Sequence, residues 1–165
     1  MPTINFGTNA NQAVVSNHSK KILEDILTDA GLGSCRITST SRTPADQARV
    51  MFNNLMEFGV KAQKKLYGSF GDAVIDVFVQ ERLKGNSPDE IKKAMEKKII
   101  ALGPSRVSRH CSDPKILNVI DVAPGSIANK KAFETAVRQA VKDKKVKKFL
   151  MPPDDPAYHL EIPQT

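Results

Sequence analysis

Ile116-Leu117-Asn118-Val119-Ile120-Asp121-Val122-Ala123 is the stretch that decides the fold of this chain. Its aliphatic and β-branched residues are typical of a central strand, and Pro124 and Gly125 then turn the chain out of that strand. One charged residue, Asp121, lies within this hydrophobic run. A carboxylate there is costly to bury unless it is paired or bound to a cation. We therefore predict a central strand that carries a chemically important group.

Hydrophobic periodicity predicts further helices and strands on either side of this strand. Spacings of three and four residues, bounded by Ser, Thr or Pro at the start and Gly at the end, indicate helices, and β-branched runs indicate strands. The helices are expected over residues 19–30, 43–59, 72–84, 87–102 and 129–143, and the other strands over residues 35–40, 146–151 and 158–162. Because helices come first and strands concentrate later, we predict an α+β fold with helices packed on one face of a small, mostly antiparallel sheet.

Length and composition favour a single domain. The chain has 165 residues, of which 40% are hydrophobic, so one core over residues 1–165 is expected. No apolar run approaches the roughly 18 residues of a membrane span, so no membrane insertion is expected. The first residues have neither the cationic start nor the apolar stretch of a secretory signal peptide.

The net charge of +7 suggests a polyanionic partner, which could be nucleic acid, an anionic cell wall or a membrane surface. The lysine-rich stretches 92–98 and 142–148 have almost no aromatic residues between them, and the chain has no Trp. Aromatic stacking platforms for bases are therefore missing, and specific nucleic-acid binding is not expected. Such lysine runs are most often solvated helix faces.

Cys35 and Cys111 are the only cysteines, and they lack the spacing of a zinc knuckle or a redox pair. The simplest interpretation is two buried thiols. A disulfide between them, or a role for Cys111 beside a functional site, remains an alternative.

Two of the three histidines have neighbours suited to metal binding. His18 lies at the start of a predicted helix, where a surface or capping role is expected. In Tyr158-His159-Leu160-Glu161-Ile162 the two-residue period of a strand puts His159 and Glu161 on one face and the aliphatic residues on the other. An edge strand that turns these polar residues to water is the alternative.

His110 can approach Asp121 if the intervening chain folds back at Asp113-Pro114. Two imidazoles and one carboxylate, from His110, His159 and Asp121, are the protein ligands of many catalytic zinc sites, which keep a fourth position for water. The residues alone thus suggest a metal site.

Three stretches resemble one family, the zinc D-alanyl-D-alanine carboxypeptidases with their relatives, the vancomycin-resistance D,D-dipeptidases and phage L-alanyl-D-glutamate endopeptidases. They are residues 37–47 (ITSTSRTPADQ), residues 108–110 (SRH) followed by 120–122 (IDV), and residues 158–161 (YHLE). The resemblance implies that His110, Asp121 and His159 bind Zn²⁺. It also implies that Arg42 stabilises negative charge on the scissile carbonyl, and that Ser108 and Gln47 line the substrate pocket.

The chain departs from the family pattern at two places. Ten residues separate His110 from Asp121, which is more than the family has, and no glycine is among them. The family's general base lies two or three residues before the last ligand, where this chain has Pro156 and Ala157. We predict Asp155 as the base, with Glu161 as its rival.

The resemblance implies a zinc metallopeptidase that cleaves peptide bonds in peptidoglycan stem peptides, as a carboxypeptidase or an endopeptidase, and we expect a monomer. The alternative is a non-catalytic peptidoglycan-binding module of the same fold, and a basic nucleic-acid-binding domain is a third possibility. Action at the cell wall or in the periplasm without a signal peptide would fit a phage endolysin, a virion-associated protein or a protein delivered by a secretion system.

Overall fold

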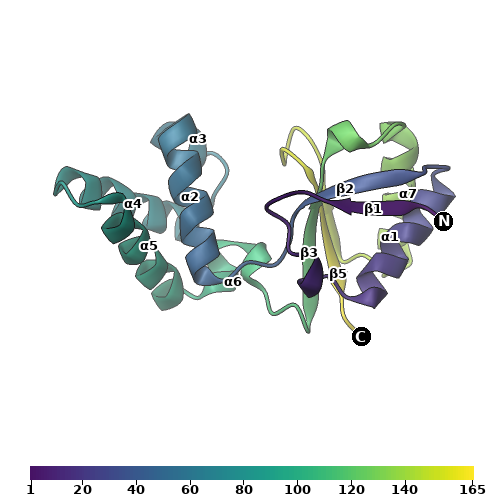
Figure 1. Ribbon diagram of the computed structural model, residues 1–165, viewed down its shortest axis with the longest axis horizontal. Coiled ribbons are helices and arrows are strands. Elements are labelled where there is room, and N and C mark those ends of the chain that lie inside the picture. The colour runs from purple at the N-terminus through teal and green to yellow at the C-terminus, as the bar shows by residue number, and fades with distance from the viewer. The chain divides into compact units, whose positions relative to one another are not determined.

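The structure is a computed structural model that describes residues 1–165, and the chain forms two compact units (Figure 1). The sheet unit comprises Met1–Ser41 and Asp113–Thr165, and the helical unit comprises Arg42–Ser112. Each unit has its own cluster of buried hydrophobic side chains. The sequence predicted one domain over residues 1–165. The division into two units was not foreseen, because hydrophobic periodicity identifies buried faces but does not say which of them share a core.

The sheet unit contains a five-stranded sheet. Its strands are, in spatial order, β1 (Thr3–Phe6), β2 (Ser34–Ser39), β3 (Leu117–Val122), β5 (Tyr158–Pro163) and β4 (Lys148–Leu150). Only β1 and β2 are parallel, and the other three pairs are antiparallel. The predicted α+β class with a mostly antiparallel sheet is therefore confirmed.

Helices α1 (Asn17–Asp29) and α7 (Lys130–Lys142) cover one face of this sheet (Figure 1). Alternate strand residues such as Ile120, Val122 and Leu160 enter the core between the sheet and these helices. Two short 3-10 helices, Gln12–Val14 and Pro124–Ser126, lie in connections of this unit. The opposite face of the sheet carries the residues that alternate with the core positions.

The helical unit has its core between α2 (Pro44–Phe58), α4 (Ser69–Leu83) and α5 (Pro88–Leu102). The rings of Phe52 and Phe78 meet edge to face with centroids 5.7 Å apart. Shorter pieces complete the unit: α3 (Val60–Lys64), α6 (Pro104–Val107) and the 3-10 helix Arg109–Cys111.

Most predicted elements are present, with shifted ends. The side chain of Thr43 accepts from the backbone N–H of Asp46 at the start of α2, and Ser87 and Glu90 form the predicted capping box of α5. Among the α-helices and strands, three were not predicted: α3 and α6 are too short to show a period, and β1 is a half-exposed edge strand of four residues. None of the helices combines the length and apolar character needed to cross a membrane.

Leu55→Ala should lower the free energy of unfolding by about 2–5 kcal/mol, because the side chain is almost fully buried in the helical core and its removal leaves a cavity. Leu83→Ala in the same unit is the matched control, since Leu83 is 84% exposed. Urea unfolding curves of both variants test this expectation, and equal midpoints would contradict the described core.

Candidate functional site

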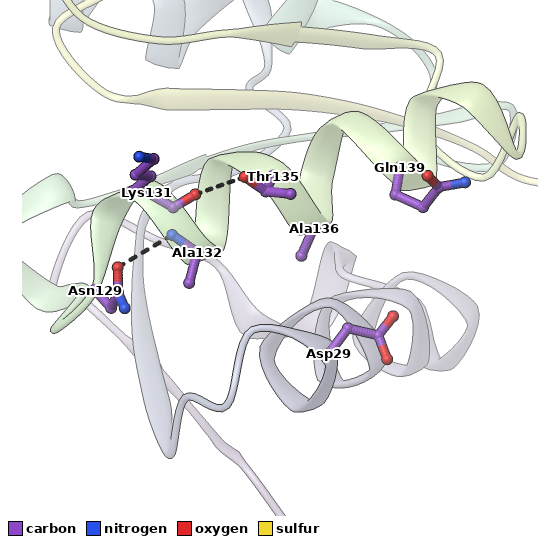
Figure 2. A pocket seen from close by; sticks show the side chains of 7 residues that line it. All are labelled: Asp29, Asn129, Lys131, Ala132, Thr135, Ala136 and Gln139. Carbon is purple, nitrogen blue, oxygen red and sulfur yellow. Dashed lines mark hydrogen bonds between the residues drawn. The ribbon is translucent and has the colours of Figure 1, made fainter.

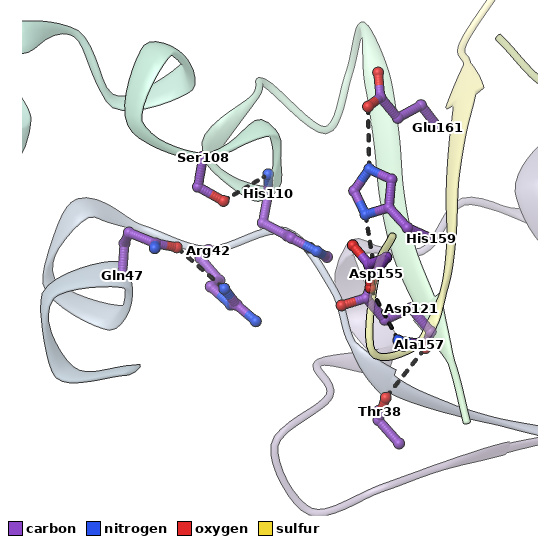
Figure 3. A network of polar contacts seen from close by, with 10 residues as sticks. All are labelled: Thr38, Arg42, Gln47, Ser108, His110, Asp121, Asp155, Ala157, His159 and Glu161. Carbon is purple, nitrogen blue, oxygen red and sulfur yellow. Dashed lines mark hydrogen bonds and ion pairs between the residues drawn. The ribbon is translucent and has the colours of Figure 1, made fainter. Parts of the chain in front are cut away.

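The pairing of β3 with β5 places a carboxylate beside an imidazole in the sheet unit. Asp121 and His159 are direct partners in this antiparallel ladder. An oxygen of the Asp121 carboxylate lies 3.0 Å from Nδ1 of His159 (Figure 3). The contact thus follows from the register of two strands that are far apart in the sequence.

A second carboxylate lies on the other side of the same ring. Glu161 is two residues after His159 and shares its face, and its Oε2 lies 3.0 Å from Nε2 of His159 (Figure 3). Leu160 and Ile162 point into the core, so the predicted division of this strand into two faces is confirmed. The edge-strand alternative is wrong, because β5 lies between β3 and β4 and both polar residues are buried.

These contacts offset the cost of burying the ring. Burial lowers the pKa of His159, but hydrogen bonds to Asp121 and Glu161, and the charges of Asp121 and Asp155, raise it to about 9. Asp155 is in the turn before β5 and accepts a hydrogen bond from the backbone N–H of Ala157. Three carboxylates therefore favour positive charge at one buried imidazole.

This arrangement suits a metal ligand. A histidine that binds a metal through one ring nitrogen usually donates its other N–H to a carboxylate, which fixes the tautomer and orients the ring. Glu161 can serve that purpose at Nε2. Nδ1 then faces the Asp121 carboxylate, and a cation between these two groups would replace the proton that they share without metal.

The helical unit brings together the other predicted residues, at the start of α2 and around the 3-10 helix Arg109–Cys111. The backbone N–H of Arg42 donates to the carbonyl of His110 at 2.7 Å. Nη1 of Arg42 donates to Oε1 of Gln47 at 3.1 Å (Figure 3). The backbone N–H of His110 donates to the hydroxyl of Ser108 at 3.3 Å. Arg42 and His110 are therefore held to each other through the main chain.

Gln47 is fully buried and contacts several members of this group. Its Nε2 donates to the hydroxyl of Tyr67 at 3.4 Å, and Sγ of Cys111 lies 3.9 Å from its Oε1. Because Gln47 is buried, it is better placed to orient the guanidinium of Arg42 than to contact a substrate, which was its predicted role. The hydroxyl of Ser108 is likewise used locally, where it caps the 3-10 helix.

Two residues of this group lie outside the main prediction: Tyr67 was not predicted, and a place for Cys111 beside a functional site was an alternative. Burial raises the pKa of Tyr67, and the charge of Arg42 and the hydrogen bond with Gln47 lower it in part. Burial also raises the pKa of Cys111 to about 11. Cys111 and Cys35 are both free thiols, so the disulfide alternative is wrong, and Cys111 does lie beside Arg42 and Gln47. Nothing in the sequence around Tyr67 indicates its role.

The predicted site residues thus form two groups, one in each unit. The sheet unit holds Asp121, Asp155, His159 and Glu161, and the helical unit holds Arg42, Gln47, Ser108 and His110. Of the three predicted metal ligands, Asp121 and His159 belong to the sheet unit, and His110 belongs to the helical unit. His18 is exposed in the first turn of α1, as predicted.

A separate hollow lies beside α7. It is lined by Asp29, Asn129, Lys131, Ala132, Thr135, Ala136 and Gln139 (Figure 2). Asn129 accepts from the backbone N–H of Ala132, and the Thr135 hydroxyl donates to the carbonyl of Lys131. These polar groups stabilise α7 itself, so the hollow offers little chemistry of its own.

Comparisons with protein-family models, with curated proteins and with solved structures found no match to this chain. The function is therefore inferred from the residues of the chain and their geometry.

The raised pKa of His159 should make the stability of the metal-free protein depend on pH. The folded pKa of about 9 exceeds the ordinary value of 6.5. The charged imidazole therefore stabilises the fold fully below about pH 6.5, and this contribution disappears as the pH rises through 9. In the presence of a chelator, the difference in unfolding free energy between wild type and His159→Gln should shrink from pH 6 to pH 10. Parallel curves would contradict the two carboxylate contacts.

Proposed function

We propose that this chain is a zinc-dependent peptidase that hydrolyses peptide bonds in the stem peptides of peptidoglycan. The observation that carries the proposal is the buried imidazole of His159 between the carboxylates of Asp121 and Glu161. A ligand histidine with a supporting carboxylate has this arrangement. The motif resemblance around Arg42, His110, Asp121 and His159 supplies the reaction class and the substrate.

His110, Asp121 and His159 would hold the metal. Two neutral imidazoles and one carboxylate suit Zn²⁺, and they leave a coordination position open for catalysis. When bound, zinc supplies Lewis acidity, which activates water and polarises a carbonyl group. Glu161 would keep His159 in the tautomer that presents Nδ1 as the ligand atom.

Asp155 is the better candidate for the general base. Glu161 is 1% exposed and engaged with Nε2 of His159, which leaves it poorly placed to exchange protons with water. Asp155 is half-buried in the turn between β4 and β5, and its charge acts on His159. It would accept the proton of the attacking water and pass it to the leaving amine.

Arg42 would stabilise the negative charge that develops on the scissile carbonyl oxygen. Its guanidinium is a planar group with several donors, and its hydrogen bond with buried Gln47 limits its orientations. Donors that are held in place before the reaction stabilise a developing oxyanion without reorganisation. Gln47 would act through Arg42 and not on the substrate.

The lengthened connection between His110 and Asp121 leaves the binding module as the second candidate. Its sheet-unit part forms an ordered turn, in which the Asp113 side chain accepts from the backbone N–H of Lys115 and Asn118 donates to the carbonyl of Pro114. The two candidates differ in metal dependence, because a module that binds without cleaving needs no zinc.

Purified wild-type protein should contain about one zinc per chain by elemental analysis, and it should release muropeptides from peptidoglycan. His159→Ala should lose both, because it removes a ligand atom and leaves two carboxylates without their partner. His18→Ala is the matched control, since this exposed histidine lies outside the site. Full zinc content and full activity in His159→Ala would refute the proposal, and binding to peptidoglycan with neither zinc nor cleavage would favour the module.

Asp155→Asn should lower kcat by about 10²–10⁴-fold with unchanged zinc content, because an amide cannot accept the proton. The neighbouring Asp154→Asn is the matched control, since Asp154 is exposed. Both variants can be followed by the rate of muropeptide release and by zinc analysis. Equal rates for the two would contradict Asp155 as the general base and favour Glu161.

A further inference from the structure

An open groove lies in the sheet unit where β1 and β2 end, apart from the residues discussed so far. It is lined by Asn5, Phe6, Gly7, Thr8, Asn9, Arg36 and Thr38, and we call it the β1–β2 groove. The segment that follows β1 is tied to β2 at both ends. The backbone N–H of Gly7 donates to the carbonyl of Ile37, and that of Asn11 donates to the hydroxyl of Thr40. The groove is therefore formed before any ligand arrives.

The strand period relates this groove to the candidate site within the same unit. Cys35 and Ile37 enter the core under α1 and α7, so Arg36 and Thr38 belong to the opposite face of β2. Asp121 and His159 alternate with core residues in the same way, and they share that face. The groove and the carboxylate–imidazole pair thus occupy one side of one sheet.

The register also fixes how near they are. Ser39 is the partner of Asp121, the ladder is irregular between Ile37 and Ser39, and the hydroxyl of Thr38 donates to the backbone carbonyl of Asp121 at 3.4 Å. Neighbouring strands lie about 4.8 Å apart and same-face residues in a strand about 6.6 Å apart. Arg36 is therefore on the order of 10 Å from Asp121. A peptide of two or three residues can span such a distance.

The lining chemistry favours an anion. Arg36 is exposed, it has no ion pair, and no carboxylate lines the groove. Asn5 is the direct partner of Arg36 in the β1–β2 ladder, so an amide stands beside the guanidinium. Arg with amide and hydroxyl donors nearby is suited to a planar carboxylate, which it can bind through two parallel hydrogen bonds.

We propose that the β1–β2 groove binds a free carboxylate of the peptide substrate, with Arg36 as the specificity-determining residue. That the anion belongs to a peptide rests on the proposed function, whereas the anion site itself rests on the groove. The carboxylate lies within about three residues of the bond that is cut. It is either the C-terminal group of the stem peptide or the α-carboxylate of a γ-linked glutamate.

Binding of small peptides to the full chain tests the groove without relying on catalysis. The probes are N-acetyl-D-alanyl-D-alanine, its C-terminal amide, and a γ-D-glutamyl peptide amide whose only carboxylate is internal. Calorimetry with a chelator present measures their affinity for wild type, Arg36→Gln and Arg138→Gln. Arg138 is the matched control because it is an exposed arginine on α7, which covers the other face of the sheet.

We expect at least one of the two carboxylate probes to bind wild type and Arg138→Gln equally, and to bind Arg36→Gln about tenfold more weakly, which is the loss of one charge-assisted hydrogen bond. The probe that responds identifies the source of the carboxylate. Equal binding of the acid and amide forms, equal binding by Arg36→Gln and wild type, or no binding of either acid would overturn the proposal. Arginine-dependent binding in a protein that lacks zinc and cleavage would support the groove while refuting the peptidase.

Discussion

The antiparallel pairing of β3 with β5 is the constraint on which the site in the sheet unit depends. It sets Asp121 against His159, and the two-residue period of β5 then adds Glu161 on the same face. The same register sends Ile120, Leu160 and Ile162 into the core. A shift of one residue would move those side chains to the opposite face and turn the polar ones toward the helices. The hydrophobic core therefore also holds the polar groups in position.

Burying an imidazole between two acids is costly unless each polar atom finds a partner. The pair of contacts at 3.0 Å meets this requirement for both ring nitrogens, and the pKa of about 9 shows that the carboxylates outweigh the loss of hydration. A site tuned in this way is ready for a positive charge, whether the charge is a proton or a metal ion. If a metal ion binds here, competition between the two would make its affinity increase with pH.

The elements that the sequence predicted well are those with strong local signals. Thr43 with Pro44 and Ser87 with Glu90 mark helix starts because the caps are made by neighbours in the chain. The two faces of β5 were likewise readable from Tyr158 to Ile162. The pairing of Asp121 with His159 depends on strand register, and Gln47 contacts Tyr67 and Cys111, which are distant in sequence. Local patterns therefore predicted the elements and the candidate residues, and long-range packing decided what each residue touches.

The helical unit interrupts the chain between β2 and β3, two strands that are antiparallel neighbours in the sheet. A turn of a few residues would be enough to join such strands. The chain instead leaves the sheet at Arg42 and returns at Asp113, with a separate hydrophobic core in between. Because the two cores are distinct, substitutions or length changes within the inserted helices can accumulate without disturbing the strands. The architecture thus joins two separately packed units, and each can change its core without repacking the core of the other.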